Sequence, residues 1–247
     1  MQLEAHKCKL PDIQVFRTLF LQEANAQIRY NACHERGWSD SYLLSVDGSS
    51  VGYGSVKGQE IPDRDTIFEF YISPPHRKWA SQLFQRLIAA SGVKLIECQS
   101  NAPLLQSMIF EFSKDIHSPV ILFSDHMITD LVAPGLVFRK KLEGDMLFKH
   151  HHEPEGSHVI VSKEEVVATG GFMLHYNAPF ADLFMEVRED LRKKGVGSYL
   201  IQELKRECYL SGRVPAARCN IENHASRATL LKAGLKIAGF MMIGTIA

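Results

Sequence analysis

Apolar positions in the first half of the chain repeat at a helical spacing in some stretches and at a strand spacing in others. An apolar residue at every fourth position predicts a long helix from Asp12 to about Glu35. Alternating runs at 42–46 and 51–56 flank Asp47-Gly48, a dipeptide that favours the tight turn of a β-hairpin. The pattern then predicts, in order, a strand over 66–72, a helix around 79–87, a strand over 93–98 and a helix over 105–116.

The second half repeats most of this order. Its pattern predicts a hairpin over 158–174, a strand over 183–187, a helix over 196–209, a strand over 214–221 and a helix over 226–233. Three pairs of corresponding residues are each 115 positions apart, namely Val51 and Val166, Ile72 and Val187, and Arg77 and Arg192. A constant offset without gaps indicates a duplicated fold.

The stretch between the two halves extends roughly from Val120 to Gly156. It contains an alternating run at 137–142, which we interpret as a strand that closes the first half. The expected domains are therefore residues 1–142 and 143–247. The second half has no counterpart of the long first helix.

Composition narrows the range of partners. The chain has 247 residues with 28 basic and 28 acidic side chains, so no overall positive field favours nucleic acid or a membrane surface. The N-terminus lacks the apolar region of a secretory signal, and no apolar run reaches the length of a membrane span. Five cysteines without a CxxC pair favour a reducing, cytoplasmic location. The oligomeric state is left open.

A basic segment with two glycines follows the strand predicted at 183–187 and opens the next helix. Residues 192–194 are Arg, Lys and Lys, and Gly195 and Gly197 carry no Cβ. Backbone N–H groups at a helix start, with nearby cations, form a binding site for phosphate. The segment lacks the ending of a P-loop and the third glycine of a Rossmann fingerprint. A solvated helix start with ordinary turn glycines is the alternative.

The run from Val187 through Arg192 to Gly197 resembles motif A of the GNAT superfamily of N-acetyltransferases, an apolar strand end followed by Arg/Gln-x-x-Gly-x-Gly/Ala. Two further family patterns follow in the expected order, carried by Asn223, Ser226, Lys232 and Gly234. The resemblance covers about residues 157–247. It implies an α/β fold with a mixed sheet, built as two tandem GNAT-like domains, and acetyl-CoA as the cosubstrate.

The same resemblance implies how acetyl-CoA binds. The pyrophosphate is expected on the N–H groups of residues 192–197 and the pantetheine arm along the strand near Val187. The implied cofactor-binding residues are Met185, Val187, Arg192, Lys193, Lys194, Gly195, Val196, Gly197, Ser198, Asn223 and Ser226.

The first half resembles a degenerate copy of the second. Ala80 and Gln82 stand where the loop has its two glycines, and Trp79 lies inside the turn. Cβ atoms at both positions, beside an indole, would block the close approach of a pyrophosphate. We therefore expect one acetyl-CoA per chain, bound by the second half, with the first half helping to form the acceptor pocket or supporting the second.

Direct transfer to an amine needs a base that takes a proton from the ammonium. The resemblance places this base near the strand at 183–187, where Asp182, Phe184 and Glu186 share one face. Glu186 is the preferred base and Asp182 the alternative. An ion pair at a strand edge would also explain either carboxylate.

Transfer also needs a proton for the departing thiolate. The family's usual acid is a tyrosine at the position that Leu230 occupies in this chain. Tyr199 is the candidate acid, with Tyr176 and solvent as the other options.

Candidate acceptor contacts lie in two places. His175, Tyr176 and Asn177 join two predicted strands, where an ordinary turn is the alternative. Gln27 and Tyr30 lie on the first predicted helix, where a solvated face explains them equally well. The histidine run at 150–152 is not expected to bind a metal, because consecutive loop residues rarely converge on one ion.

We interpret the chain as an acetyl-CoA-dependent N-acetyltransferase that acts on an amine. Its neutral charge favours a small-molecule acceptor over a protein lysine. A non-catalytic acyl-CoA-binding module or sensor is one alternative, motivated by the missing tyrosine and the degenerate first half. A relative of the aminoacyl-tRNA-dependent acyltransferases is another, and it would need a basic groove.

Overall fold

The computed structural model describes residues 1–23, 28, 31–151 and 154–247. The chain divides into two compact units. Unit 1 comprises Met1–Pro119 together with Gly239–Ala247, and unit 2 comprises Val120–Ala238. Among the described residues, no helix is long and apolar enough to cross a membrane.

Unit 1 contains a mixed sheet in the order β1-β2-β3-β4-β5-β12. The strands are β1 (Leu3–Cys8), β2 (Ser39–Val46), β3 (Ser49–Lys57), β4 (Thr66–Ile72), β5 (Leu95–Gln99) and the end of β12 (Leu235–Ile246). The β4–β5 pair is parallel and the other pairs are antiparallel. The β2–β3 turn has Asp47 at φ 47° and Gly48 at φ 79°, as the Asp-Gly signal predicts.

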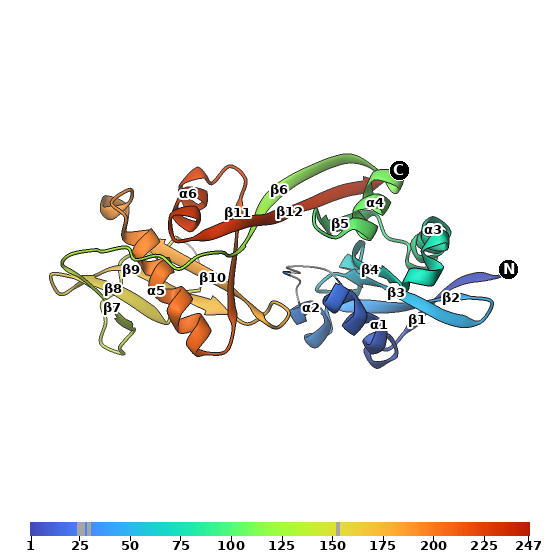
Figure 1. The fold of residues 1–247 in the computed structure, drawn as a ribbon, viewed down its shortest axis with the longest axis horizontal. Coiled ribbons are helices and arrows are strands. Elements are labelled where there is room, and N and C mark those ends of the chain that lie inside the picture. The colour runs from blue at the N-terminus through green and yellow to red at the C-terminus, as the bar shows by residue number, and fades with distance from the viewer. Residues whose placement is uncertain (24–27, 29–30, 152–153) are drawn as a thin grey trace. The chain divides into compact units, whose positions relative to one another are not determined.

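Helices cover both faces of this sheet (Figure 1). On one face α1 (Leu10–Glu23) and α2 (Asn31–Glu35) pack on the middle strands, where Phe20 contacts Tyr53 and Tyr71 edge to face. On the other face lie α3 (Ala80–Ser91) and α4 (Pro103–Phe112). Their apolar sides complete the larger core of the unit.

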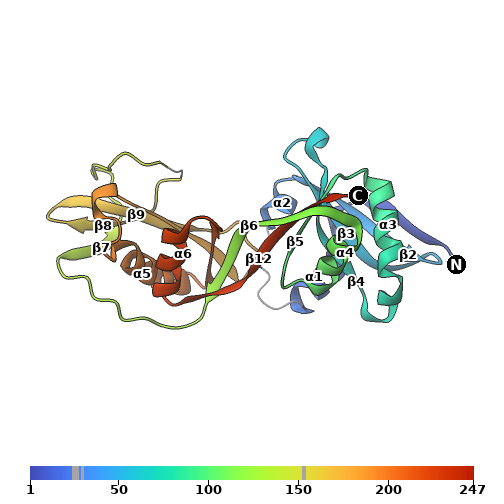
Figure 2. The ribbon, with the colours of Figure 1, turned by 90° about the horizontal axis from the view of Figure 1, so that it is seen from above.

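Unit 2 repeats the mixed sheet in the order β6-β11-β10-β9-β8-β7. Its strands are β6 (Ser113–Asp125, from Val120 on), β7 (Leu136–Lys140), β8 (His158–Ser162), β9 (Glu165–Met173), β10 (Phe180–Val187) and β11 (Val214–Asn220). The helix α5 (Val196–Leu210) packs on β9 and β10, and α6 (His224–Lys232) lies beside α5 (Figure 2).

The predicted duplication is confirmed, and the two units also share an equivalent hydrogen bond. In unit 1 the Nε atom of Arg77 donates to the Ile72 carbonyl at 3.1 Å. In unit 2 the Nε atom of Arg192 donates to the Val187 carbonyl, also at 3.1 Å. Each arginine thus fastens the segment after a strand to the last residue of that strand.

Two predicted helices are too long. The expected helix from Asp12 to Glu35 is not continuous, and the described residues form α1 (Leu10–Glu23) and α2 (Asn31–Glu35). Ile28, between them, is not helical, and its carbonyl accepts a hydrogen bond from the Gln99 side chain. The helix predicted over 105–116 ends at Phe112 because the chain continues there as the strand β6.

The division into units also differs from the predicted boundary at residues 142 and 143. The strand at 136–140 does not close the first half, because it pairs with β8 of unit 2 along its full length. The last strand of unit 1 comes instead from the chain's end, since β12 pairs with β5 from Met241 to Thr245. Neither β12 nor β1 was predicted from the apolar pattern.

Candidate functional site

The parallel strands β10 and β11, in the middle of the sheet of unit 2, are paired over only part of their length. The strand β10 pairs with β11 only from Phe180 to Asp182. On its other side β10 pairs with β9 as far as Val187. Among the described residues, the edge of β10 that faces β11 is therefore not paired with a strand over residues 183–187. The Val187 carbonyl on this edge accepts from Arg192 Nε, and the remaining backbone groups of the edge can bind a ligand.

The loop after β10 brings several backbone N–H groups to the start of α5. A short 3₁₀ turn (η3, Glu189–Leu191) leads to Lys193 at φ 62° and Gly195 at φ 85°. Gly195 is the N-cap of α5 and supplies no side-chain cap among the described residues, so the N–H groups of the first turn are not satisfied within the helix. Left-handed residues alternating with right-handed ones form the backbone concavities that bind anions.

Gly197 allows three elements to meet closely. A Cβ atom placed there would lie 3.2 Å from Thr229 Cγ2 of α6 and 3.3 Å from Met185 Cε of β10. Those separations are tighter than ordinary van der Waals contact. The glycine thus keeps the start of α5 close to both neighbours.

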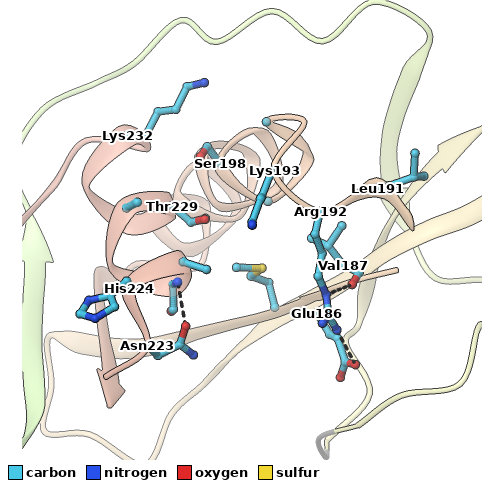
Figure 3. A pocket seen from close by; sticks show the side chains of 16 residues that line it. Glu186, Val187, Leu191, Arg192, Lys193, Ser198, Asn223, His224, Thr229 and Lys232 are labelled. Atoms are coloured by element: carbon cyan, nitrogen blue, oxygen red, sulfur yellow. Dashed lines mark hydrogen bonds and ion pairs between the residues drawn. The ribbon is translucent and has the colours of Figure 1, made fainter. Parts of the chain in front are cut away.

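These elements enclose a cavity of about 710 Å³. Its walls come from the end of β10, the loop, the first turn of α5 and one face of α6 (Figure 3). The lining residues are Met185, Glu186, Val187, Leu191, Arg192, Lys193, Gly195, Gly197, Ser198, Asn223, His224, Ala225, Ser226, Ala228, Thr229 and Lys232.

Positive side chains dominate the loop side of the cavity. Lys193 extends from the loop toward the open centre (Figure 3). The Nζ atom of Lys232 comes within 3.8 Å of the position of a Cβ on Gly195. Arg192 lies 4.0 Å from Glu186 and 3.7 Å from Glu189. Cations beside an uncapped helix start favour a polyanionic group.

Most residues of the predicted cofactor set line this cavity. The exceptions are Lys194, which is exposed, and Val196, whose side chain is buried. Asn223 also caps α6, since its Oδ1 accepts from the Ser226 N–H at 3.0 Å. The prediction missed the α6 face formed by Ala225, Ala228, Thr229 and Lys232, although its spacing of three or four residues is that of a helix face.

Glu186, the preferred base, lies at the edge of the cavity on the sheet face opposite α5. It pairs across strands with Thr169, whereas Gly170, the next residue of β9, faces Leu200 and Leu204 of α5. Its Oε1 accepts the His151 N–H at 2.9 Å, and 9% of the residue is exposed. Glu186 therefore anchors the segment that precedes β8.

Asp182, the alternative base, is on the same face, where β10 and β11 separate. It is 3% exposed, and its Oδ2 lies 3.1 Å from His175 Nε2 and 3.5 Å from Arg218 Nε. Burial raises the pKa of Asp182, and the contact with His175 opposes that rise. The predicted acceptor residues His175 and Tyr176 thus gather at Asp182, outside the set that lines the cavity.

Two other predicted residues, Tyr199 and Asn177, do not line the cavity, and two more lie outside the described residues. Tyr199 lies on α5 outside the cavity lining. Asn177 is buried, and its carbonyl accepts the Phe180 N–H at 2.8 Å, as the turn interpretation expects. Gln27 and Tyr30 fall outside the described residues.

The histidine run before β8 has structural contacts where it is described. His150 stacks on Phe148 and its Nε2 lies 2.6 Å from the Thr169 hydroxyl, while His152 is outside the described residues. In the part of the chain that the structure describes, no group of three His, Cys, Asp or Glu side chains could hold a metal ion.

The corresponding segment of unit 1 has a different backbone. The chain forms a 3₁₀ turn from Pro74 to Trp79 (η2), and Ala80 follows in right-handed helical geometry with φ −58°. None of residues 74–82 has positive φ. Lys78 lies over the Trp79 ring. Unit 1 therefore lacks the positive-φ backbone that the loop of unit 2 has at Lys193 and Gly195.

Comparison with known proteins assigns both halves to one class. Residues 9–126 match the family described as "Acetyltransferase (GNAT) domain", and residues 126–235 match "Acetyltransferase (GNAT) family". No curated protein sequence matches the chain.

Solved structures show the same fold over the whole chain. An acetyltransferase from the GNAT family of Colwellia psychrerythraea has a TM-score of 0.74 at 13% identity, with 100% of both chains covered. A GCN5-related N-acetyltransferase from Sphaerobacter thermophilus has a TM-score of 0.59 at 12% identity and covers 98% of this chain and 95% of its own. A tandem GNAT protein from the clavulanic acid biosynthesis pathway has a TM-score of 0.55 at 11% identity, with 99% of this chain and 98% of that protein covered.

Proposed function

The chain belongs to the GNAT family of acetyltransferases and carries two such domains in tandem, and on this premise we propose that unit 2 binds acetyl-CoA and transfers its acetyl group to an amine. The observation that carries the proposal is the cavity of Figure 3, where an open strand edge leads to a helix start and cationic side chains. A ligand with a polyanionic end and a narrow arm that contains amides fits both parts of this site.

The loop and the strand edge have separate tasks in this proposal. The N–H groups of residues 193–197 bind the pyrophosphate, with charge from Lys193 and Lys232. The pantetheine arm follows residues 183–187 of β10 and takes the hydrogen bonds of the missing neighbouring strand. The four steps from residue 183 to residue 187 span about 13 Å, so the arm brings the thioester toward the point where β10 and β11 separate.

Acetyl-CoA supplies the activated thioester, and the chain supplies position and proton handling. The acceptor we propose is a small-molecule amine, because a chain without net charge has no field that recruits a charged macromolecule. Glu186 lines the cavity and is the candidate base carried by β10, although its Oε1 already accepts the His151 N–H. Its role stays a prediction.

The buried Leu230 favours one alternative function. This residue of α6 is 3% exposed, and because an alkyl side chain has no acidic proton, the position delivers none to a departing thiolate. A non-catalytic acyl-CoA-binding module would share the cavity and lack turnover. Release of free CoA in the presence of a panel of primary amines separates an enzyme, which releases it, from a module, which does not.

A charge reversal in the loop tests where acetyl-CoA binds. Acetyl-CoA at about 100 times its dissociation constant is expected to stabilise unit 2 by about 2.7 kcal/mol. Lys193→Glu is expected to remove most of the resulting rise in Tm, because it places a carboxylate where the phosphates bind. Thermal denaturation with and without acetyl-CoA measures the effect.

The matched control is Lys78→Glu, which reverses the lysine 115 positions earlier, in unit 1. This variant should keep the full rise in Tm. A wild-type chain whose Tm does not respond to acetyl-CoA contradicts the proposed function, and a response lost equally in both variants contradicts the assignment to unit 2.

A further inference from the structure

A buried charged cluster stands where β10 and β11 separate. Asp182 is the last residue of β10 that pairs with β11, opposite Ala216, and the open strand edge begins at the next residue. The cluster consists of Asp182 with His175, Tyr176 and Arg218. It lies at the end of the path along which the proposed function places the thioester.

The geometry of the cluster fixes the histidine ring. Nε2 of His175 is 3.1 Å from Asp182 Oδ2, and the side chains are 15% and 4% exposed. The Tyr176 ring stands at 89° to the imidazole, with 4.7 Å between ring centroids. A carboxylate beside Nε2 favours the tautomer, or the imidazolium, that carries a proton on that nitrogen.

Two further side chains lie at the Asp182 carboxylate, which burial disfavours in its charged form. Arg218 Nε lies 3.5 Å from Asp182 Oδ2, with 42% of the arginine side chain exposed. Burial beside Asp182 raises the pKa of Tyr176 well above its ordinary value, so the phenol stays protonated at neutral pH. Arg213 donates to the carbonyls of Tyr176 and Phe180 and holds the loop that carries His175.

The chemistry of this cluster suits proton transfer better than that of Glu186. An imidazole ordinarily titrates near pH 6.5 and so exchanges protons readily near neutral pH, whereas an ordinary carboxylate is a weak base there. Glu186 also accepts the backbone N–H of His151. A buried carboxylate contacts His175, as one contacts the histidine base of serine proteases, although here the contact is to Nε2 and not to Nδ1.

We infer that His175 is the general base that deprotonates the acceptor amine, and that Asp182 is a positioning residue that orients the imidazole. This assignment rests on the proposed function and specifies which residue of unit 2 handles the proton.

The step balances as follows. Neutral His175 takes one proton from the acceptor ammonium, and the freed lone pair of the nitrogen attacks the thioester carbonyl carbon. The C–N bond forms and the C–S bond breaks. The second nitrogen proton passes to the departing sulfur to give the CoA thiol, while the imidazolium returns its proton to solvent. The net products are an amide, CoA and one proton.

The first test is steady-state release of CoA from acetyl-CoA with alkyl amines, arylalkyl amines, diamines and amino acids across the pH range. His175→Gln is expected to lower kcat by about 100-fold to 10,000-fold, to leave KM for acetyl-CoA within about twofold of wild type, and to abolish the rise of kcat with pH near neutrality. Added imidazole should restore part of the rate. The matched control His126→Gln replaces an exposed histidine of unit 2 and should leave kcat unchanged.

The second readout needs no acceptor. The His175 ring resonance, identified by its loss in His175→Gln, is titrated by NMR in wild type and in Asp182→Asn. Loss of the carboxylate is expected to lower the midpoint by about one pH unit or more. An unchanged midpoint overturns the positioning role of Asp182.

The two proposals fail in different ways. A wild-type chain that releases CoA while His175→Gln keeps its kcat overturns this inference alone, and a loss confined to Glu186→Gln would make Glu186 the base. A wild-type chain that binds acetyl-CoA and releases no CoA with any amine contradicts the proposed transfer and this inference together.

Discussion

Replacing Glu69 by leucine is expected to destabilise unit 1 by about 3–5 kcal/mol, the usual cost of leaving a buried charge without its partner. Glu69 is fully buried in β4. Its carboxylate accepts hydrogen bonds from Arg17 Nε and from the Tyr53 hydroxyl, each at 3.0 Å. His34 Nε2 also lies 3.0 Å from the carboxylate. These contacts connect α1 and α2 to the sheet, so the substitution should weaken the packing of both helices on it.

The same residue gives unit 1 a defined sensitivity to acid. Burial by itself raises the pKa of Glu69, but Arg17 and His34 outweigh that effect and hold the pKa well below its ordinary value of 4.5. A carboxylate with a depressed pKa contributes its full stability above the unfolded-state pKa and loses it as the pH falls through the folded-state value. The contribution is therefore complete at neutral pH and declines below about pH 4.5.

Urea denaturation from pH 7 to pH 3 measures both effects. The gap in unfolding free energy between wild type and Glu69→Leu should be largest at neutral pH and should narrow as the pH falls. Glu60→Leu, at an exposed position, is the matched control and should change stability by less than about 0.5 kcal/mol. A gap that stays constant with pH would show that the ion pair does not provide the stabilisation.

Removal of Gly239–Ala247 is expected to abolish cooperative folding of unit 1. These nine residues belong to that unit, and their strand covers the edge of β5. Met241, Met242 and Ile246 pack in or against apolar parts of the unit. A fully buried apolar side chain contributes about 1.5–3 kcal/mol, and Met242 and Ile246 are partly buried. Together with the lost pairing of β5, their loss is a large part of the stability of a domain, about 5–15 kcal/mol.

Hydrogen exchange read along the chain tests this prediction. In the truncated chain, the amides of β4 and β5 should exchange at rates close to those of an unfolded chain. The control is Thr245→Ala, which changes an exposed side chain of the same strand and should preserve protection. Full protection of β5 in the truncated chain would contradict the role given to β12.

The sequence pattern predicted those elements whose apolar periodicity is visible within one short segment. The strand at 66–72 and the helix that opens at Val196 agree with the structure at those positions. The patterns failed where long-range pairing decides. The alternating apolar and polar residues at 136–140 predict a strand but do not show which half it joins. Only its pairing with β8 places this strand in unit 2. The same holds for β12, whose partner β5 lies more than 100 residues earlier.

The site shows a similar division. The glycines and basic residues of the loop are consecutive in sequence, so one segment was enough to predict the cavity wall that they form. Asp182 and His175 were noted separately, but their 3.1 Å contact depends on how the β9–β10 connection folds back. The tie between Glu186 and the His151 N–H likewise joins segments that sequence alone does not bring together.

Isothermal titration of the full chain with acetyl-CoA tests the central claim most directly. The loop of unit 2 has left-handed residues at Lys193 and Gly195, whereas Ala80 of unit 1 is helical. We therefore predict one acetyl-CoA bound per chain, and a loss of binding in Gly197→Val, whose side chain would press on Thr229 and Met185. Two equivalents per chain, or none, would contradict the account.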